Sequence, residues 1–257
     1  MLPVALTIAG SDPSGGAGIQ ADLKTFHQHR VYGMAAITLV TVQNTVSVSH
    51  VEMLSADLVR QQVIAVISDV PPNAAKTGAL GSLEVVKAVA ALAAEFAFPL
   101  VVDPVMISKH GARLISPEAE AALKNELLPE AYLVTPNIPE AELLCGLEIR
   151  DEKDMLRAAR RLCHAGCRAV LIKAGHLDGP PVDLLLDGDE VTRFAGVRVD
   201  GPHTHGTGCT LSAAITANLA LGMTLQKAVD RAKRFVQAAI GTAPGIGHGH
   251  GPLNHWA

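Results

Sequence analysis

The amino-acid sequence predicts a single α/β domain in which a mostly parallel β-sheet lies between two layers of helices. Short runs of β-branched residues alternate with longer segments that carry apolar residues at helical spacing. This alternation implies a parallel sheet that is covered by helices on both faces. Residues 182–194 have instead the pattern of a β-hairpin, and two helical segments follow one another near the end of the sequence.

Two α/β architectures are compatible with a chain of 257 residues. A closed (βα)8 barrel typically has about 250 residues, and an open doubly wound sheet also fits. The hairpin and the two closing helices break a strict eightfold repeat, so we favour an open three-layer α/β/α sandwich. No repeat or linker divides the chain, and we expect one domain over residues 1–257. Its ligands should bind beyond the carboxyl ends of the strands.

The first half of the chain is predicted to contain five strands and three helices. The strands are expected at residues 4–9, 35–40, 50–54, 74–77 and 100–102. The helices are expected to run from the glycine-rich residues 10–18 to residue 28, and at residues 55–68 and 82–96. Ser55 has the side chain of a helix N-cap, with Asp57 in the first turn.

The second half continues the pattern and then departs from it. Ser116 followed by Pro117 is typical of an N-cap with proline at the first helical position. The remaining elements are expected as strands at 132–134 and 169–173, a helix at 151–165, hairpin strands at 182–186 and 191–194, and helices at 206–221 and 225–243.

The composition excludes several classes of protein. Apolar residues make up 49% of the chain, aromatic residues only 3%, and the net charge is −4 with no basic block. A nucleic-acid-binding protein would need a cluster of Lys and Arg and usually stacking aromatics, so we expect no nucleic-acid partner. The start of the chain lacks a basic segment, and apolar runs such as residues 88–94 are too short to cross a bilayer. We therefore expect a cytoplasmic protein with no membrane partner.

The most informative motif, residues 204–210, reads Thr-His-Gly-Thr-Gly-Cys-Thr and leads into an apolar helix. Gly206, Thr207 and Gly208 are expected to leave backbone N–H groups free for an anion, and the helix N-terminus adds partial positive charge. Such a hole suits a phosphoryl group in transfer. Cys209 is expected to have a pKa below the free value of about 8.5 and to take a proton from a substrate hydroxyl. The alternative is that the motif only begins a helix and that Cys209 is a small core residue.

A second glycine-rich segment, residues 10–18, joins a predicted strand to a predicted helix. It lacks the Gly-x-Gly-x-x-Gly dinucleotide fingerprint, and no Gly-Lys-Ser/Thr sequence occurs in the chain. The segment therefore predicts neither a dehydrogenase nor a Walker A loop. It is compatible with closure over a small ligand or with a tight turn alone.

Single polar residues stand at the ends of several predicted strands. Asp103 and Glu140 are candidates to hold Mg²⁺, directly or through water. Asn137 could contact nucleotide phosphates, and Lys173 needs an anionic partner at the end of a buried strand. Gln43 could form two hydrogen bonds with an aminopyrimidine edge. Loop capping or a surface ion pair remains the alternative for each residue taken alone.

Several segments together resemble the bacterial hydroxymethylpyrimidine/phosphomethylpyrimidine kinases of thiamine biosynthesis. The similar segments are residues 5–12, 15–25, 43–45, 103–106, 135–137, 205–210 and 247–252. The resemblance runs from end to end, and Gly-Ile-Gln-Ala-Asp together with His-Gly-Thr-Gly-Cys is highly specific. It implies a ribokinase-like fold with a small β-flap, ATP and Mg²⁺ as cofactors, two successive phosphorylations, and a homodimer.

The resemblance also assigns roles to residues of this chain. For the pyrimidine it implies contacts with Gln43, Asp22, Ala17, Val105 and Ala79. For the anion hole it implies Gly206, Thr207, Gly208 and Cys209, with Cys209 where most ribokinase-like enzymes have a catalytic Asp. For MgATP it implies Asn137, Lys173, Thr204, Lys233, Asp103 and Glu140.

The chain departs from the family's usual residues at a few positions. Ala79 stands where many members have Met against the substrate ring, which makes the pocket wider. Pro202 and His203 stand where a Lys or Arg and an Asn are common. The nearest alternative is a pyridoxal or pyridoxine kinase, and an alternative of another class is a vitamin-binding regulator without catalysis.

Overall fold

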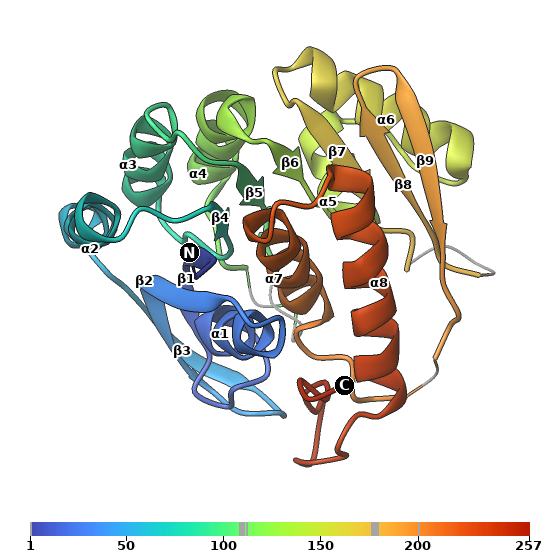
Figure 1. Cartoon of the computed structure of the whole chain (residues 1–257), viewed down its shortest axis with the longest axis horizontal. Helices are drawn as coiled ribbons and strands as arrows, with labels where there is room; N and C mark the ends of the chain where they lie inside the picture. Colours follow the sequence, from blue (N-terminus) through green and yellow to red (C-terminus); the bar gives the residue numbers. More distant parts are fainter. Residues whose placement is uncertain (1, 108–110, 112, 176–179, 200) are drawn as a thin grey trace.

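The computed structural model describes residues 2–107, 111, 113–175, 180–199 and 201–257. These residues form one nine-stranded sheet between helices, in the order β3-β2-β1-β4-β5-β6-β7-β8-β9 (Figure 1). The six strands from β2 to β7 in this order are parallel, whereas β3 at one edge and β8 and β9 at the other are antiparallel to their neighbours. The predicted three-layer sandwich with a mostly parallel sheet is confirmed.

The elements have the following bounds. The strands are β1 (Val4–Ser11), β2 (Tyr32–Gln43), β3 (Val48–Met53), β4 (Ala74–Thr77), β5 (Leu100–Val102), β6 (Leu133–Val134), β7 (Ala169–Ile172), β8 (Val182–Asp187) and β9 (Glu190–Ala195). The helices are α1 (Gly18–Gln28), α2 (Ala56–Asp69), α3 (Leu83–Ala93), α4 (Pro117–Ala122), α5 (Ile138–Cys145), α6 (Glu152–His164), α7 (Thr207–Ala220) and α8 (Leu225–Gly241). A π-helical turn (Leu123–Leu127) and a 3₁₀ turn (Leu128–Glu130) follow α4.

The sheet separates two apolar cores because successive side chains of a strand point to opposite faces. In β1, Leu6 and Ile8 belong to the core under α2, α3, α4, α5 and α6, whereas Ala5 belongs to the core under α1, α7 and α8. Figure 1 shows α1, α7 and α8 gathered on one face of the sheet. Strands buried on both faces read as continuous aliphatic runs, which is why they could be predicted from the sequence.

Helix starts follow the capping residues that the sequence contains. The side chains of Ser55, Ser82 and Ser116 each accept a hydrogen bond from the backbone N–H three residues later. Helix α5 has no counterpart in the prediction. Asn137 caps it, and the Glu140 side chain accepts from the backbone N–H of Asn137 in return, so the two residues form a capping box.

The topology fixes where a ligand can bind. Strand β1 has β2 on one side and β4 on the other, so the loops that follow β1 and β4 diverge at the carboxyl end of the sheet. The antiparallel pair β2–β3 extends beyond this edge as the small β-flap, with Gln43 at the end of β2. Within the described ranges, none of the helices combines the length and apolarity needed to cross a bilayer.

Candidate active site

A cavity of about 700 Å³ opens at the carboxyl ends of the strands. Its volume lies in the range of pockets that enclose small ligands. The cavity is lined by nearly all the residues that the sequence singles out: Ala17, Gln43, Ala79, Asp103, Val105, Asn137, Glu140, Lys173, Thr204, Gly206, Thr207, Gly208, Cys209 and Lys233. The structure therefore brings these residues together at one site, with Asp22 as the exception.

The loop before α7 has the geometry of an anion hole. Gly206 is the N-cap of α7 and has φ +79°, and a Cβ there would lie 1.8 Å from the carbonyl oxygen of Gly16. No other residue fits this position without displacing the backbone. The first hydrogen bond of the helix runs from Thr210 N to Gly206 O, so the N–H groups of Gly208 and Cys209 precede it. Helix N–H groups in this position are available to an anion.

Gly208 brings the backbone against two charged side chains. A Cβ at this position would lie 3.3 Å from Lys173 Nζ and 3.7 Å from Asp103 Oδ2. The absence of a side chain therefore lets a cation stand beside the helix N-terminus. A phosphoryl group in this loop would meet backbone N–H groups and the Lys173 ammonium together.

Cys209 does not have the lowered pKa that its place at a helix N-terminus predicts. Burial raises the pKa of the thiol to about 11, and the carboxylates of Asp22 and Asp103 act in the same direction. Lys76 and the backbone N–H of Gly18 oppose this shift without cancelling it. The prediction was wrong because desolvation of the thiolate outweighs the partial charge of one helix end. Cys209 therefore holds its proton at neutral pH.

Asp22 and Lys76 form an ion pair inside the molecule. Asp22 Oδ1 accepts from Lys76 Nζ at 2.8 Å, Oδ2 accepts from Thr7 Oγ1 at 2.6 Å, and both charged side chains are 0% exposed. Burial would lower the pKa of Lys76, but Asp22 and other nearby acidic groups outweigh burial and raise it. Burial in turn raises the pKa of Asp22. The short contact has the geometry of an ionised pair, and we describe it as one.

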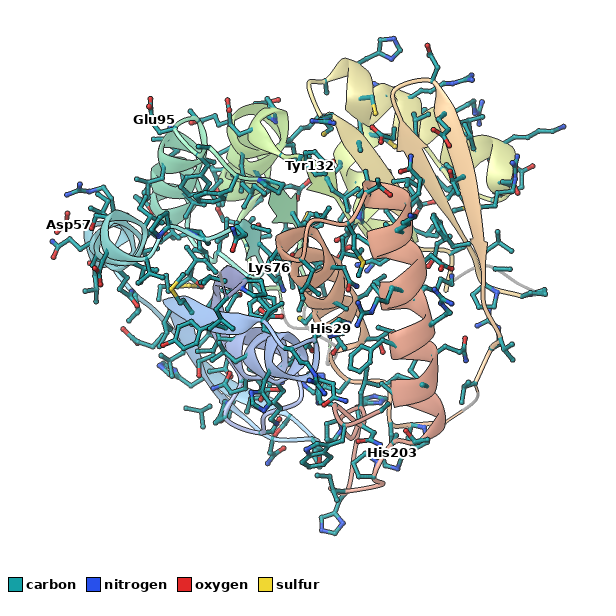
Figure 2. The ribbon with its side chains drawn as sticks, viewed as in Figure 1. His29, Asp57, Lys76, Glu95, Tyr132 and His203 are labelled. Carbon is teal, nitrogen blue, oxygen red and sulfur yellow. The ribbon has the colours of Figure 1, made fainter. Side chains whose placement is uncertain are left out.

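In this structure Asp22 contacts Lys76, and the expected contact of Asp22 with the substrate stays a prediction. Asp22 is fully buried and holds Lys76, which lies at the floor of the cavity. Figure 2 shows Lys76 near the centre of the molecule, whereas Asp57 and Glu95 lie at its periphery. Lys76 was not predicted as a site residue from the sequence. The available signal was a lone cation within a four-residue strand of buried residues.

Lys173 lies between the two candidate metal ligands. Its Nζ is 3.0 Å from Asp103 Oδ1 and 4.0 Å from Glu140 Oε2. Thr135 and Ser212 also donate to the Asp103 carboxylate, at 3.2 and 3.3 Å. Burial would raise the pKa of Asp103, but Lys173 and the hydrogen bonds outweigh burial and lower it. The predicted anionic partner of Lys173 is therefore Asp103.

Glu140 behaves differently from Asp103. Burial raises the pKa of its carboxyl to about 7, Asp103 adds to the shift, and Lys173 opposes it. The carboxyl also accepts from the backbone N–H of Asn137 at 2.8 Å. Asn137 Oδ1 in turn accepts from Glu140 N at 2.9 Å, so the structural role of Asn137 is to cap α5. The site thus contains a carboxylic acid that is about half protonated at neutral pH.

The far end of the cavity is lined by α8. Lys233 Nζ lies 2.6 Å from Asp183 Oδ2, while Asp183 Oδ1 accepts from the backbone N–H of Ala174 at 2.9 Å. Asp183 therefore orients this lysine, a pairing that was not predicted from the sequence. Thr204 lines the cavity and its carbonyl accepts from Thr207 Oγ1 at 2.8 Å, which closes the turn before α7.

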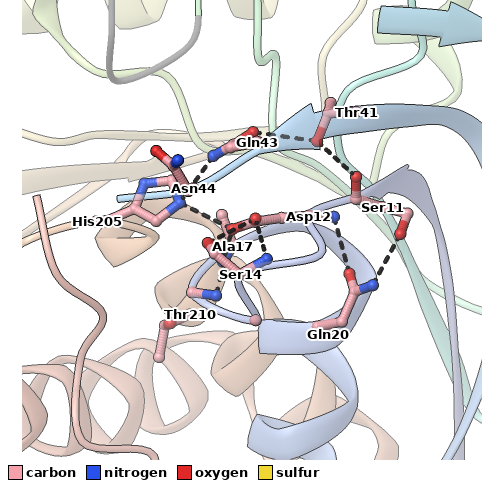
Figure 3. A network of polar contacts seen from close by, with 12 residues as sticks. Ser11, Asp12, Ser14, Ala17, Gln20, Thr41, Gln43, Asn44, His205 and Thr210 are labelled. Carbon is pink, nitrogen blue, oxygen red and sulfur yellow. Dashed lines mark hydrogen bonds and ion pairs between the residues drawn. The ribbon is translucent and has the colours of Figure 1, made fainter. Parts of the chain in front are cut away.

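The glycine-rich segment after β1 is built around a carboxylate of its own. Asp12 accepts from the backbone N–H groups of Ser14, Gly16 and Ala17 at 2.9, 3.2 and 2.9 Å (Figure 3). These N–H groups are therefore already used, and the loop is not a free phosphate cradle. Ala17 at the end of this segment lines the cavity.

Gln43 approaches this loop from β2. Its side-chain amide lies 3.1 Å from His205 Nε2 and 3.2 Å from Thr41 Oγ1, and His205 Nε2 lies 2.8 Å from Asp12 Oδ2 (Figure 3). The amide is therefore held from both sides at one end of the cavity. The anion hole lies directly after His205 in the chain.

Fold and site together define a ribokinase-like kinase of small molecules, with the geometry of an anion hole at a helix N-terminus and the side-chain amide of Gln43 in the same cavity. The phosphomethylpyrimidine kinase family model matches residues 12–254. The chain belongs to this family.

Individual relatives agree with this assignment. The hydroxymethylpyrimidine/phosphomethylpyrimidine kinases of Bacillus subtilis and Synechococcus elongatus are 47% and 48% identical, over 98% and 99% of this chain and 94% and 98% of the relatives. A thiamine biosynthesis bifunctional protein of Geobacter sulfurreducens is 51% identical over 97% of this chain. The chain spans 51% of that bifunctional protein's length.

Solved structures show the same fold. Phosphomethylpyrimidine kinase from Clostridium difficile superposes with a TM-score of 0.83 at 44% identity, covering 93% of this chain and 99% of that one. Pyridoxal kinase from Staphylococcus aureus in complex with AMP-PCP and pyridoxal gives 0.92 at 38% identity, covering 100% and 94%. The chain is therefore similar to kinases named for two different ring alcohols.

Proposed function

We propose that the protein transfers the terminal phosphate of ATP to 4-amino-5-hydroxymethyl-2-methylpyrimidine, and then a second phosphate to the monophosphate, in thiamine biosynthesis. The observation that carries the proposal is the pairing of two features in one cavity. The Gln43 amide offers a donor and an acceptor to the ring, and the loop around Gly208 offers backbone N–H groups and Lys173 to the phosphoryl group. The names of the relatives supply the identity of the ring.

The donor set at the cavity suits Mg²⁺. Asp103 and Glu140 present carboxylates, which are ligands that Mg²⁺ prefers, usually with several waters. The raised pKa of Glu140, about 7, marks a site where more positive charge would be stabilising. We therefore propose that Asp103 and Glu140 hold Mg²⁺. When bound, the ion neutralises charge on the phosphates of ATP.

The residues of the chain would divide the remaining tasks. Asn137, Thr204 and Lys233 would bind the nucleotide, while Ala17, Ala79 and Val105 would enclose the ring beside Gln43. For Cys209 to accept the proton of the hydroxymethyl group, its pKa must fall from about 11 toward neutrality. Lys76 is the residue whose charge lowers it most, so the buried pair would support catalysis from behind the site.

The test is an assay that couples ADP release to three acceptors: the hydroxymethylpyrimidine, its monophosphate and pyridoxal. We expect both pyrimidines to be phosphorylated, with the diphosphate as the final product. ADP release without a phosphorylated pyrimidine would overturn the proposal. Tight pyrimidine binding with no ADP release would favour the regulator instead.

Pyridoxal is a second candidate acceptor because one observation favours it. Ala79 lines the cavity and leaves space that a longer side chain would fill. Solved pyridoxal kinases superpose closely on this chain. We expect Ala79→Met to lower kcat/KM for pyridoxal more than for the pyrimidine, with Ala79→Val as an intermediate control. Equal losses for both rings would show that residue 79 does not select between them.

We also propose a cytoplasmic homodimer. Strands β2 and β3 at the sheet edge expose Val40, Val42 and Met53, which would be covered by a second copy. Light scattering after size-exclusion chromatography tests this, and Val40→Asp should shift the mass toward that of one chain.

A further inference from the structure

His205 contacts two residues of the site through a single ring nitrogen (Figure 3). Its Nε2 lies 2.8 Å from Asp12 Oδ2 and 3.1 Å from the Gln43 amide. The side chain is 5% exposed, so bulk water does not share these contacts. The protonation of this one nitrogen therefore decides which atom of Gln43 must face it.

The contact with Asp12 requires a hydrogen on His205 Nε2. The Asp12 carboxylate accepts from backbone N–H groups of Ser14, Gly16 and Ala17. Burial would raise the pKa of Asp12, but the hydrogen bonds from His205 and Ser14 outweigh it and lower the pKa. An ionised carboxylate only accepts, so Nε2 must donate. This holds for the neutral Nε2–H tautomer and for the imidazolium alike.

With that hydrogen in place, the amide group of Gln43 that faces His205 must be an acceptor, and it shares the single Nε2–H with Asp12 Oδ2 in a three-centre hydrogen bond. If the NH₂ group faced Nε2, as drawn in Figure 3, two donors would oppose each other. The oxygen and nitrogen of a side-chain amide differ little in size, and the hydrogen-bond network decides between them. The network here requires the oxygen of Gln43 at His205.

Thr41 leads to the same conclusion independently. Its Oγ1 lies 3.0 Å from the carbonyl oxygen of Ser11 and 3.2 Å from the Gln43 amide. A hydroxyl has one hydrogen to donate. When that hydrogen goes to Ser11, the hydroxyl must accept from Gln43, and the NH₂ group must face Thr41. A single half-turn of the amide resolves both conflicts.

We propose that His205 is a positioning residue that, with Asp12 and Thr41, holds the Gln43 amide with its oxygen toward His205 and its nitrogen toward Thr41. An amide has two N–H groups and two oxygen lone pairs, and these partners use one of each. One donor and one acceptor remain, in a fixed order along the amide. The opposite orientation would reverse that order.

The fixed order of the remaining donor and acceptor on the Gln43 amide specifies how a ring can bind. This inference about the ring rests on the proposed function. An aminopyrimidine edge presents a ring-nitrogen acceptor beside an amino donor, so only one orientation of the ring matches the amide. His205 directly precedes Gly206, and a Cβ at Gly16 would lie 2.6 Å from His205 Cδ2. His205, which orients the Gln43 amide, is thus packed between the glycine-rich segment 10–18 and the loop that begins α7. The orientation of the amide would determine whether the hydroxymethyl group points to the anion hole.

Long-range ¹H–¹⁵N correlation NMR on protein with ¹⁵N-labelled histidine tests the proton directly. The spectrum of the wild-type protein should show His205 Nε2 protonated, with assignment from the signal that disappears in His205→Gln. An unprotonated Nε2 would overturn the proposal. This measurement needs neither substrate nor turnover, so its outcome is independent of the proposed function.

Kinetics provide the second test, with an isosteric pair at residue 41. Thr41→Val removes the hydroxyl at nearly constant shape and should raise KM for the pyrimidine roughly tenfold, which is about 1.4 kcal/mol, with KM for ATP unchanged. Thr41→Ser keeps the hydroxyl and should behave as the wild type. His205→Ala should act like Thr41→Val, and neither should add to the effect of Gln43→Ala. Effects that multiply independently would refute the shared role.

A buried histidine elsewhere controls for loss of packing. His29 at the C-cap of α1 (Figure 2) is also buried, and its Nδ1 lies 2.9 Å from the carbonyl oxygen of Thr25. His29→Ala should lower the melting temperature without changing KM for either substrate. If it raised KM for the pyrimidine as much as His205→Ala does, the effect would be a general loss of packing and the proposal would fail.

Discussion

Replacing Asp22 with Asn tests the buried ion pair behind the site. The substitution keeps the shape of the side chain and removes its charge, so the ammonium of Lys76 loses its partner at 2.8 Å. Both side chains are 0% exposed, so bulk water cannot solvate the ammonium of Lys76 in place of the lost carboxylate. Thr7 also loses the charge that accepts its hydroxyl hydrogen.

The expected loss in the free energy of unfolding is large. Breaking a buried pair by removing one partner typically costs about 3–5 kcal/mol, because an uncompensated charge stays in the interior. Natural domains are stable by only about 5–15 kcal/mol, so Asp22→Asn should remove a large fraction of the stability. The double variant Asp22→Asn/Lys76→Met buries no charge at this position and should recover part of the loss.

Urea unfolding followed by circular dichroism measures these differences. Asp230→Asn is the matched control, because Asp230 and Arg234 form a pair that is 53% and 74% exposed, and such pairs contribute about 0–1 kcal/mol. A loss below 1 kcal/mol for Asp22→Asn, or no recovery in the double variant, would refute the reasoning.

Three further predictions concern the chemistry. Gly206→Ala should abolish turnover, since its Cβ would lie 1.8 Å from Gly16 O. The control is Gly222→Ala, which has a similar φ of +80° with no atom within 4 Å and should cost only about 1–2 kcal/mol of stability. Equal effects of the two substitutions on kinetics and on urea unfolding would contradict the role of the close contact. Cys209→Ala should lower kcat about 10²–10⁴-fold if the thiolate form of Cys209 takes the substrate proton, and an unchanged kcat would leave that step to other groups. The Mg²⁺ concentration for half-maximal activity should fall as the pH rises through about 7, because Glu140 ionises there. The Glu140→Gln variant should lose this pH dependence. A half-maximal Mg²⁺ concentration that stays constant with pH in the wild-type protein would argue against Glu140 as a ligand.

Much of the fold could be predicted because the local and global signals agree. Strands β4 and β5 have the predicted bounds, since each is a short run of buried residues that polar or turn residues end. Helix α5 was missed for the opposite reason. It has only eight residues and begins with Ile138 and Pro139, and Asn137 was considered only as a nucleotide contact, without its additional role as the N-cap.

The residues of the site could be predicted better than their electrostatics. Motifs at strand ends predicted most of the cavity wall, because parallel strands bring their carboxyl ends to one edge. The partner of Lys76 could not be predicted, since Asp22 is 54 residues away and meets it only through the packing of α1 on the sheet. The prediction of a lowered pKa for Cys209 failed likewise, because burial depends on the whole fold, whereas the helix N-terminus is a local feature of the sequence.

A crystal structure with a non-hydrolysable ATP analogue, Mg²⁺ and the hydroxymethylpyrimidine tests the central claim most directly. We expect the terminal phosphate to accept hydrogen bonds from the N–H groups of Gly208 and Cys209, with the hydroxymethyl oxygen facing that phosphate and the ring on Gln43. A terminal phosphate held away from the start of α7, or a ring bound outside the Gln43 end of the cavity, would contradict the account.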